Sequence, residues 1–316
     1  MTSLIEKIRQ QAQSEIKKII LTETEDSRIQ QAAKICTEQK IADILFVDQD
    51  YIQTHSDLHQ QLSQQLFELR QSKGLTLEES QRLLFKPIYF GTMMVKNHLA
   101  DGLVAGANTT TLETFLPALQ IIKAKPKYKL ASSFMLIQSP LANFGYQGTF
   151  IFSDCGLNIN PNPDELAEIT IQSAESFRTL VGTEPKIAML SFSTGDSGKG
   201  EDVDKVRLAT QRVKQLDPTL IVDGPIQADA AIVPEVAKFK NPGGSIKGDA
   251  NILIFPNLDA GNIAYKLIER LAKTQAVGPI SQGLNYPIND LSRGCCVEDI
   301  INAIAITSIQ SKLSKF

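Results

Sequence analysis

The stretch that decides the fold is Lys18–Asp48, KIILTETEDSRIQQAAKICTEQKIADILFVD. It begins and ends with continuous apolar runs that close in polar residues, and each run predicts a buried β-strand. Four residues between the runs recur at helical spacing, and we expect them to face the core from one helix. These residues are Ile29, Ala32, Ala33 and Cys36. Apolar strands separated by amphipathic helices predict a parallel sheet covered on both faces.

The same alternation continues along the rest of the chain. Further strands are predicted at Gly102–Ala107, Lys129–Ile137, Lys186–Thr194, Thr219–Ile226 and Ala250–Leu258. The segment Gly148–Leu166 is predicted to form a strand, then a loop, then the beginning of a helix. Further helices are predicted near residues 112–123, 202–216 and 261–274, and the N-terminal MTSLIEKIRQQAQSEIKK has the pattern of an amphipathic helix. Together these patterns predict two α/β lobes in close contact, with a boundary near Ser132–Pro140.

The bulk composition is typical of a folded globular protein. With 42% hydrophobic and 21% charged residues among 316, the chain lacks the bias of a disordered one. A net charge of −3 gives no reason to expect nucleic acid or an anionic membrane as partner. Since the 4 cysteines lack C-x-x-C spacing and no signal core or membrane-length apolar run occurs, we expect free thiols in a cytoplasmic protein.

Several local patterns argue against common kinds of site. No G-x-G-x-x-G dinucleotide fingerprint follows a predicted strand, and no G-x-S-x-G elbow occurs. His55, His59 and His98 have no metal-like grouping, so we expect no metal, and the first two lie in a glutamine-rich stretch expected on a solvated face. Ser193–Val206, STGDSGKGEDVDKV, stands between a strand and a helix but lacks P-loop spacing. It is either a phosphate-binding loop or an ordinary turn.

The segment Asn289–Ile300, NDLSRGCCVEDI, gathers an arginine, a hydroxyl and carboxylates at the start of an apolar helix. Glu298 and Asp299 favour the positive end of the helix dipole. Arg293 opposes that dipole unless an anion lies nearby, and either an anionic ligand or a surface ion pair would explain its position. The pair Cys295–Cys296 offers either an activated thiolate or small packing residues, and packing is the more frequent role.

These stretches together resemble the phosphate acetyltransferases, of the phosphate acetyl/butyryltransferase family. The signature NDLSRGCCVEDI is accompanied, in chain order, by ILTETEDSRIQQAA, LRQSKG, ADGLVAGANTTT, PALQIIK, AMLSFST, VDGPIQADAA, ANILIFPNL and GNIAYKLIERLA. The resemblance covers essentially the whole chain, so the combination is specific where each stretch alone is weak. It implies two α/β/α lobes with a cleft between them, isocitrate/isopropylmalate dehydrogenase-like, and usually a homodimer. We expect the lobes at residues 1–134 plus 295–316 and at 135–294.

The activity that the resemblance implies is reversible acetyl transfer, in which acetyl-CoA and phosphate give CoA and acetyl phosphate. By position in the motif, Asp299 matches the proposed base for the CoA thiol, and Arg293 matches the arginine that steadies phosphate and the developing oxyanion. Ser292 matches the hydroxyl that positions acetyl phosphate. Direct attack in a ternary complex requires neither a metal nor a cofactor, since CoA is a substrate.

Four further residues in the matched stretches are expected to bind substrate. They are Arg70, Thr111, Ser193 and Asn262. Of these, Arg70 matches a family arginine assigned to CoA.

Two departures from the family pattern remove positive charge and lead us to expect weaker CoA binding. Leu116 stands where the family usually has another CoA arginine, for which Lys123 is a candidate substitute, and Asp249 stands where a lysine is common.

The acid–base chemistry of the motif contains a tension. An aspartate carboxyl, with an ordinary pKa of about 4, is a poor base for a thiol of pKa about 8.5. We therefore expect stabilisation of the thiolate by Arg293 to matter as much as proton removal by Asp299.

Three alternatives remain open at this stage. The chain could prefer butyryl or another acyl group, or it could bind CoA or acetyl phosphate without turnover, for which Leu116 and Asp249 are the only support. An NAD(P)-dependent dehydrogenase on the related fold lacks a nucleotide fingerprint. No motif specifies the acyl preference, the favoured direction, the oligomeric state or activation by monovalent ions.

Overall fold

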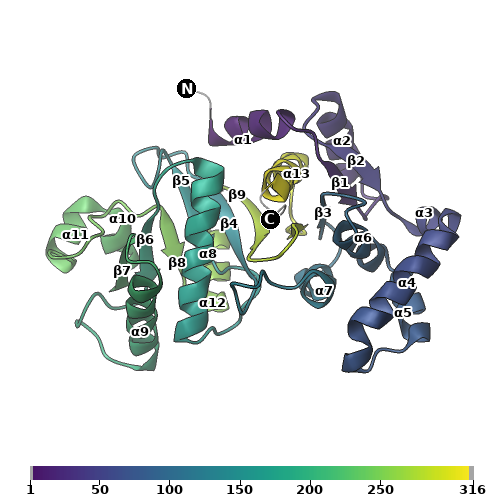
Figure 1. The fold of residues 1–316 in the computed structure, drawn as a ribbon. Helices are drawn as coiled ribbons and strands as arrows, with labels where there is room; N and C mark the ends of the chain where they lie inside the picture. Colours follow the sequence, from purple (N-terminus) through teal and green to yellow (C-terminus); the bar gives the residue numbers. More distant parts are fainter. Residues whose placement is uncertain (1–2, 313–316) are drawn as a thin grey trace. The chain divides into compact units, whose positions relative to one another are not determined.

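The computed structural model describes residues 3–312, which divide between two compact units (Figure 1). Of the described residues, unit 1 comprises 3–125 and 284–312, and unit 2 comprises Pro126–Gly283. The boundaries expected from sequence lay about ten residues later at each crossing. Residues 284–294 belong with unit 1 because their strand, β10 (Ile288–Asp290), pairs in parallel with β3 (Gly102–Ala105) of that unit. Each unit is described by itself.

Unit 1 is built on a parallel four-stranded sheet in the order β10-β3-β1-β2, completed by β1 (Lys18–Leu21) and β2 (Asp43–Phe46). Its helices are α1 (Leu4–Gln13), α2 (Ser27–Glu38), α3 (Gln49–Thr54), α4 (Ser56–Arg70), α5 (Leu77–Leu84), α6 (Pro87–Lys96), α7 (Thr111–Pro117) and α13 (Val297–Lys312). A 3₁₀ turn (Gln71–Lys73) follows α4, and a π-helical turn (Ala118–Ile122) follows α7.

The apolar C-terminal helix α13 is the centre of unit 1. It packs against β1 and β3 and also contacts α1 and α2, while α6 packs against β3 and α7 against β10. All four residues predicted to face the core from α2 are buried. Figure 1 draws α4 and α5 as a pair that lies side by side.

Unit 2 contains a six-stranded sheet in the order β7-β6-β8-β5-β4-β9. Its strands are β4 (Ser132–Gln138), β5 (Thr149–Ser153), β6 (Lys186–Leu190), β7 (Ile221–Ile226), β8 (Ile252–Ile254) and β9 (Gln275–Gln282). The prediction of a purely parallel sheet is wrong for this unit, because β4 runs antiparallel to both β5 and β9. A buried apolar run has the same composition in either direction, so the pattern could not reveal this reversal.

The helices of unit 2 are α8 (Pro163–Val181), α9 (Glu201–Leu216), α10 (Ala228–Ile232), α11 (Pro234–Lys240) and α12 (Leu258–Leu271). Helices α8 and α9 contact each other, with α8 over the middle of the sheet and α9 against β6 and β7. One core cluster joins alternate strand residues, among them Phe152 and Leu253, to Ala230 of α10 and Tyr265 of α12. The predicted mixed α/β class is confirmed.

Two expectations about single residues also have an outcome. The four cysteines are free, as predicted. The expectation that His59 lies on a solvated face is wrong: it is buried, its ring lies 4.3 Å from that of Phe85, and its Nε2 is 3.1 Å from the Gln81 carbonyl oxygen. The glutamines around it lie on the other faces of α4, so the sequence pattern did not reveal that His59 belongs to the buried face.

Candidate active site

The turn between β10 and α13 carries the predicted catalytic residues. After Asp290 the chain makes a tight bend, in which the Cys295 amide donates to the Ser292 carbonyl oxygen at 2.8 Å. Cys295 is buried and anchors the bend, whereas the side chain of Arg293 is exposed at its tip. Ser292 is half-buried beneath it, and its Oγ accepts a long 3.4 Å bond from the Gly294 amide.

Asp299, in the first turn of α13, faces back toward the same bend. Its Oδ2 accepts hydrogen bonds from the Cys296 amide at 3.0 Å and from the Cys296 Sγ at 3.1 Å. A carboxylate at this position satisfies an amide that the helix itself leaves without a partner. The structure thus places Ser292 and Arg293 in the bend and Asp299 in the first turn of the helix that follows it.

The two acidic residues of the first turn of α13 have different surroundings. Glu298 forms an ion pair with Arg9 at 2.6 Å, and the Arg9 Nε donates to Asn302 Oδ1 at 2.9 Å, so this carboxylate ties α13 to α1. Asp299 is the carboxylate that faces the bend.

Arg293 itself forms no ion pair within residues 3–312. It lies close enough to Glu113 to help lower the pKa of that exposed carboxyl, although hydrogen bonds from Thr110 are the main cause. The guanidinium therefore retains its donors for an anionic ligand, which favours the ligand explanation of its position over the surface ion pair.

Asp290, the last residue of β10, is a buried carboxyl directly before the bend. It is fully inaccessible, and neither of its oxygens makes a hydrogen bond of regular geometry among the described residues. Burial raises its pKa to about 7, against a smaller lowering by the nearby hydroxyls of Thr111 and Thr114. A Cβ on Gly106 would lie 2.1 Å from Asp290 Oδ1, so only glycine allows the carboxyl to lie here.

Neither cysteine of the bend has the properties of an activated nucleophile. Burial raises the pKa of the Cys295 thiol to about 12, and burial together with the Asp299 hydrogen bond raises the pKa of Cys296. A thiolate is the reactive form of cysteine, so an elevated pKa argues against nucleophilic catalysis by either thiol.

The predicted substrate-binding residues of unit 1 lie in two places. Thr111 begins α7 and is close enough to Asp290 to affect its titration, which puts it beside the bend. Arg70 ends α4, where its Nη1 lies 3.4 Å from the carbonyl oxygen of Gln120 in the π-helical turn. Leu116, which replaces an expected arginine, is 39% exposed and leaves that part of α7 without charge.

The predicted substrate-binding residues of unit 2 lie at β6 and α12. Ser193 is buried just beyond β6, with its Oγ 3.0 Å from that of Ser197. Asn262 is half-buried on α12 and donates to the carbonyl oxygen of Cys155 at 3.0 Å. The charge of Asp249 is balanced by an ion pair with Lys186 at 2.5 Å, so this departure adds no free negative charge.

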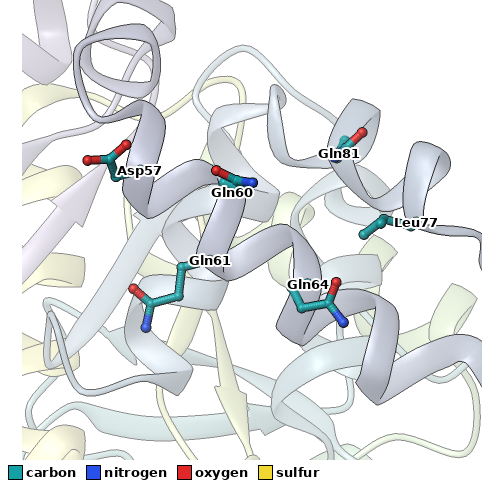
Figure 2. Close-up of a pocket in the computed structure, with 6 residues that line it drawn as sticks. All are labelled: Asp57, Gln60, Gln61, Gln64, Leu77 and Gln81. Carbon is teal, nitrogen blue, oxygen red and sulfur yellow. The ribbon is translucent and has the colours of Figure 1, made fainter.

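Two pockets of unit 1 have the wrong charge for phosphate. Figure 2 shows a pocket of about 410 Å³ whose lining residues come from α4 and α5. They are Asp57, Gln60, Gln61, Gln64, Leu77 and Gln81, and none carries a positive charge. A second hollow, at the ends of β1 and β2, is lined by five carboxylates among other residues. Neither includes Arg293.

Between residues 3 and 312, no cluster of three or more His, Cys, Asp or Glu side chains is suited to hold a metal ion. Within the same residues, every helix is too short or too polar to span a membrane.

Comparison with known proteins assigns the chain to a family. A sequence profile of the phosphate acetyl/butaryl transferase family matches residues 3–308. The chain is a member of this family. A phosphate acetyltransferase of Acetivibrio thermocellus is 46% identical over 99% of each chain. Phosphotransacetylase structures from Streptococcus pyogenes (38% identity, TM-score 0.89) and Staphylococcus aureus (40%, 0.84) each match 98% of both chains.

The match to the phosphate acetyl/butaryl transferase family confirms the resemblance that the motifs indicated. Sequence reasoning nevertheless missed the residues that hold the bend in place. Arg28, on α2, donates to the carbonyl oxygen of Arg293 in the bend and to that of Ala107 in the adjacent loop. Glu23, in the loop after β1, accepts a hydrogen bond from the Gly106 amide of that adjacent loop. Each of these partners is 79 or more residues away in sequence. The only signal was the acidic and basic composition of the ETEDSR stretch.

Proposed function

We propose that this protein catalyses the reversible transfer of an acetyl group between acetyl-CoA and phosphate. Relatives that match it over nearly their whole length are named phosphate acetyltransferases. The observation that carries the proposal is the segment Ser292–Asp299 of unit 1, where an exposed guanidinium that forms no ion pair among residues 3–312, a hydroxyl and a carboxylate lie within eight positions.

In the proposed reaction the sulfur of CoA attacks the carbonyl carbon of acetyl phosphate. The carbon–sulfur bond forms, the carbon–oxygen bond to phosphate breaks, and phosphate leaves with that electron pair. Arg293 would bind the phosphoryl oxygens and stabilise the charge that develops on them. Ser292 would orient the phosphate by a hydrogen bond, and Asp299 would accept the thiol proton.

Stabilisation of the anionic groups by Arg293 matters at least as much as the base in this mechanism. The ordinary pKa of a thiol is several units above that of an aspartate, so proton transfer to Asp299 alone is uphill. A guanidinium stabilises both the thiolate and the leaving phosphate, and it cannot lose its own charge at neutral pH.

Arg70, Thr111, Ser193 and Asn262 are proposed to bind substrate, with Arg70 directed at a phosphate of CoA. No metal or cofactor is assigned a step. A homodimer in the cytoplasm remains our proposal for the state in which the enzyme works.

The test is phosphate-dependent formation of acetyl phosphate from acetyl-CoA by the purified protein, followed as release of free CoA thiol. The proposal expects turnover that requires phosphate and is faster with acetyl-CoA than with butyryl-CoA. A faster rate with butyryl-CoA would reassign the acyl group. CoA binding without thiol release would instead identify a non-catalytic member of the family.

A further inference from the structure

Arg28 uses every donor of its side chain to join three segments of unit 1. Its Nε and Nη2 donate to the two carboxylate oxygens of Asp26, at 3.1 and 2.7 Å. Its Nη1 donates to the carbonyl oxygens of Arg293 at 3.0 Å and Cys295 at 2.9 Å, and its Nη2 also donates to that of Ala107 at 3.0 Å. A guanidinium has five N–H groups in a fixed plane, and each of them has an acceptor here.

The two carbonyl groups of the bend belong to peptide units that continue to the predicted catalytic residues. In a planar trans peptide the N–H points away from the C=O. Beyond the Arg293 carbonyl, the Gly294 amide points to Ser292 Oγ at 3.4 Å. Beyond the Cys295 carbonyl, the Cys296 amide donates to Asp299 Oδ2 at 3.0 Å. Arg28 is therefore linked through one peptide unit to each of these side chains.

Two acidic residues close to Arg28, Asp26 and Glu23, hold the arginine and the loop of residues 106–109. Asp26 is 8% exposed, and the paired guanidinium lowers the pKa of its carboxyl to about 2. The Glu23 carboxylate accepts the four successive backbone amides of residues 106–109, at 2.7 to 3.0 Å. The loop that Arg28 contacts through Ala107 is thus itself held by hydrogen bonds, and Arg28 connects this loop to the bend.

We propose that Arg28 is a positioning residue for acyl transfer, which fixes and polarises the two peptide units that hold Ser292 and Asp299 and orient Arg293. The inference rests on the proposed function. Arg28 need not touch substrate, because its effect passes through the backbone. Hydrogen-bonded peptide units strengthen one another, and errors of about 1 Å in a reacting group lower rates by about 100-fold.

The test compares Arg28→Lys with Arg9→Lys. Lysine keeps the charge but offers three donors from a single point, so it cannot satisfy five acceptors. Arg9 is the matched control, since it is also a partly buried arginine of unit 1 that binds a carboxylate, and it contacts α13 at Glu298 and Asn302 rather than at the bend. Arg9→Lys loses contacts to α13, whereas Arg28→Lys loses those to the bend.

We expect Arg28→Lys to lower kcat by about 10- to 100-fold, with the dissociation constant for CoA changed by less than about threefold. Hydrogen–deuterium exchange of the segment 291–297 should be faster in Arg28→Lys than in wild type. Arg9→Lys should keep both the wild-type kcat and the wild-type exchange of that segment, even if its melting temperature falls equally.

The outcomes separate the inference from the function on which it rests. An active wild type, with equal kcat and equal exchange in the two variants, would overturn the positioning role. A wild type without acetyl transfer would refute the proposed function. The exchange measurement would then still decide whether Arg28 holds the bend, because unchanged exchange in Arg28→Lys would overturn that as well.

Discussion

Two Ser/Gly-rich turns follow strands of this protein, one after β10 in unit 1 and one after β6 in unit 2, and they are supported differently. The β10 turn has its carbonyl groups held by Arg28 and a buried cysteine at its base. In the β6 turn, Asp196 is 99% exposed, and no atom lies within 4 Å of where a Cβ on Gly195 or Gly200 would be.

The local sequence of a turn therefore does not show which distant residues hold its backbone. Both turns precede a helix N-terminus and both contain serine, glycine and a cation, so both are candidates for anion binding. The β6 turn also has hydrogen bonds to other segments, from the Gly195 amide to the Pro225 carbonyl oxygen at 3.0 Å and from Arg207 Nη2 to the Gly195 carbonyl oxygen at 2.9 Å. The β10 turn differs in that one arginine, Arg28, holds two of its carbonyl groups from 265 and 267 residues away. Preorganised donors stabilise a transition state more than mobile ones, because they need no rearrangement during the reaction.

The largest expected contrast comes from removing the cation of each turn. Arg293→Ala should lower kcat by about 100- to 1,000-fold, the range seen when a hydrogen-bond donor to a developing charge is lost. Lys199→Ala, the same truncation in the exposed β6 turn, should lower kcat by less than about threefold. Steady-state rates of CoA release at saturating acetyl-CoA and phosphate measure both, and equal losses would contradict the comparison.

A second contrast concerns stability and the glycines of the two regions. Gly106→Ala places a Cβ 2.1 Å from Asp290 Oδ1 and 2.6 Å from the Leu291 amide, at a φ of +109°. We expect a loss of about 3 kcal/mol or more in the free energy of unfolding. Gly195→Ala meets no atom and only its φ of +56° is unfavourable, so its loss should be about 1 kcal/mol. Urea denaturation of both variants would test this, and a larger loss for Gly195→Ala would refute the argument.

A smaller effect is the pH dependence that buried Asp290 gives to unit 1. Its pKa is raised to about 7 in the folded chain, above the ordinary aspartate value of about 4, so the folded state binds the additional proton between these pH values. The contribution of this group to stability is therefore full below about pH 4 and declines as pH rises toward 7, by at most about 1.4 kcal/mol per pH unit.

Asp290→Asn removes that titration while it keeps the size of the side chain. The difference in melting temperature, variant minus wild type, should become more positive between pH 5 and pH 8. The same difference at both pH values would show that Asp290 does not titrate in this window.

Most strands and helices could be predicted because apolar periodicity reports which residues face a core. The helices α3 to α6, α10 and α11 were not predicted, and neither were two strands, for which there are physical reasons. β9 contains Gly278 and Pro279, which normally argue against a strand, but it lies at the edge of its sheet, where proline is tolerated. β10 has only three residues, and its PIND composition reads as a turn.

The candidate site could be predicted only as far as its residues are neighbours in sequence. Ser292, Arg293 and Asp299 lie within eight positions, and motif resemblance was enough to single them out. The contribution of Arg28 depends on contacts to segments 79 to 267 residues away. No local pattern encodes such contacts, because they arise only when the strands of unit 1 align side by side.

The guanidinium of Arg293, on a turn whose backbone Arg28 holds, is proposed to contribute at least as much to catalysis as the Asp299 carboxylate. The direct test is kcat for acetyl phosphate formation by Arg293→Ala and by Asp299→Asn, in preparations whose folding is matched by melting temperature. We expect the loss for Arg293→Ala to be at least as deep as that for Asp299→Asn. A deeper loss for Asp299→Asn would contradict it and would assign the main role to proton removal.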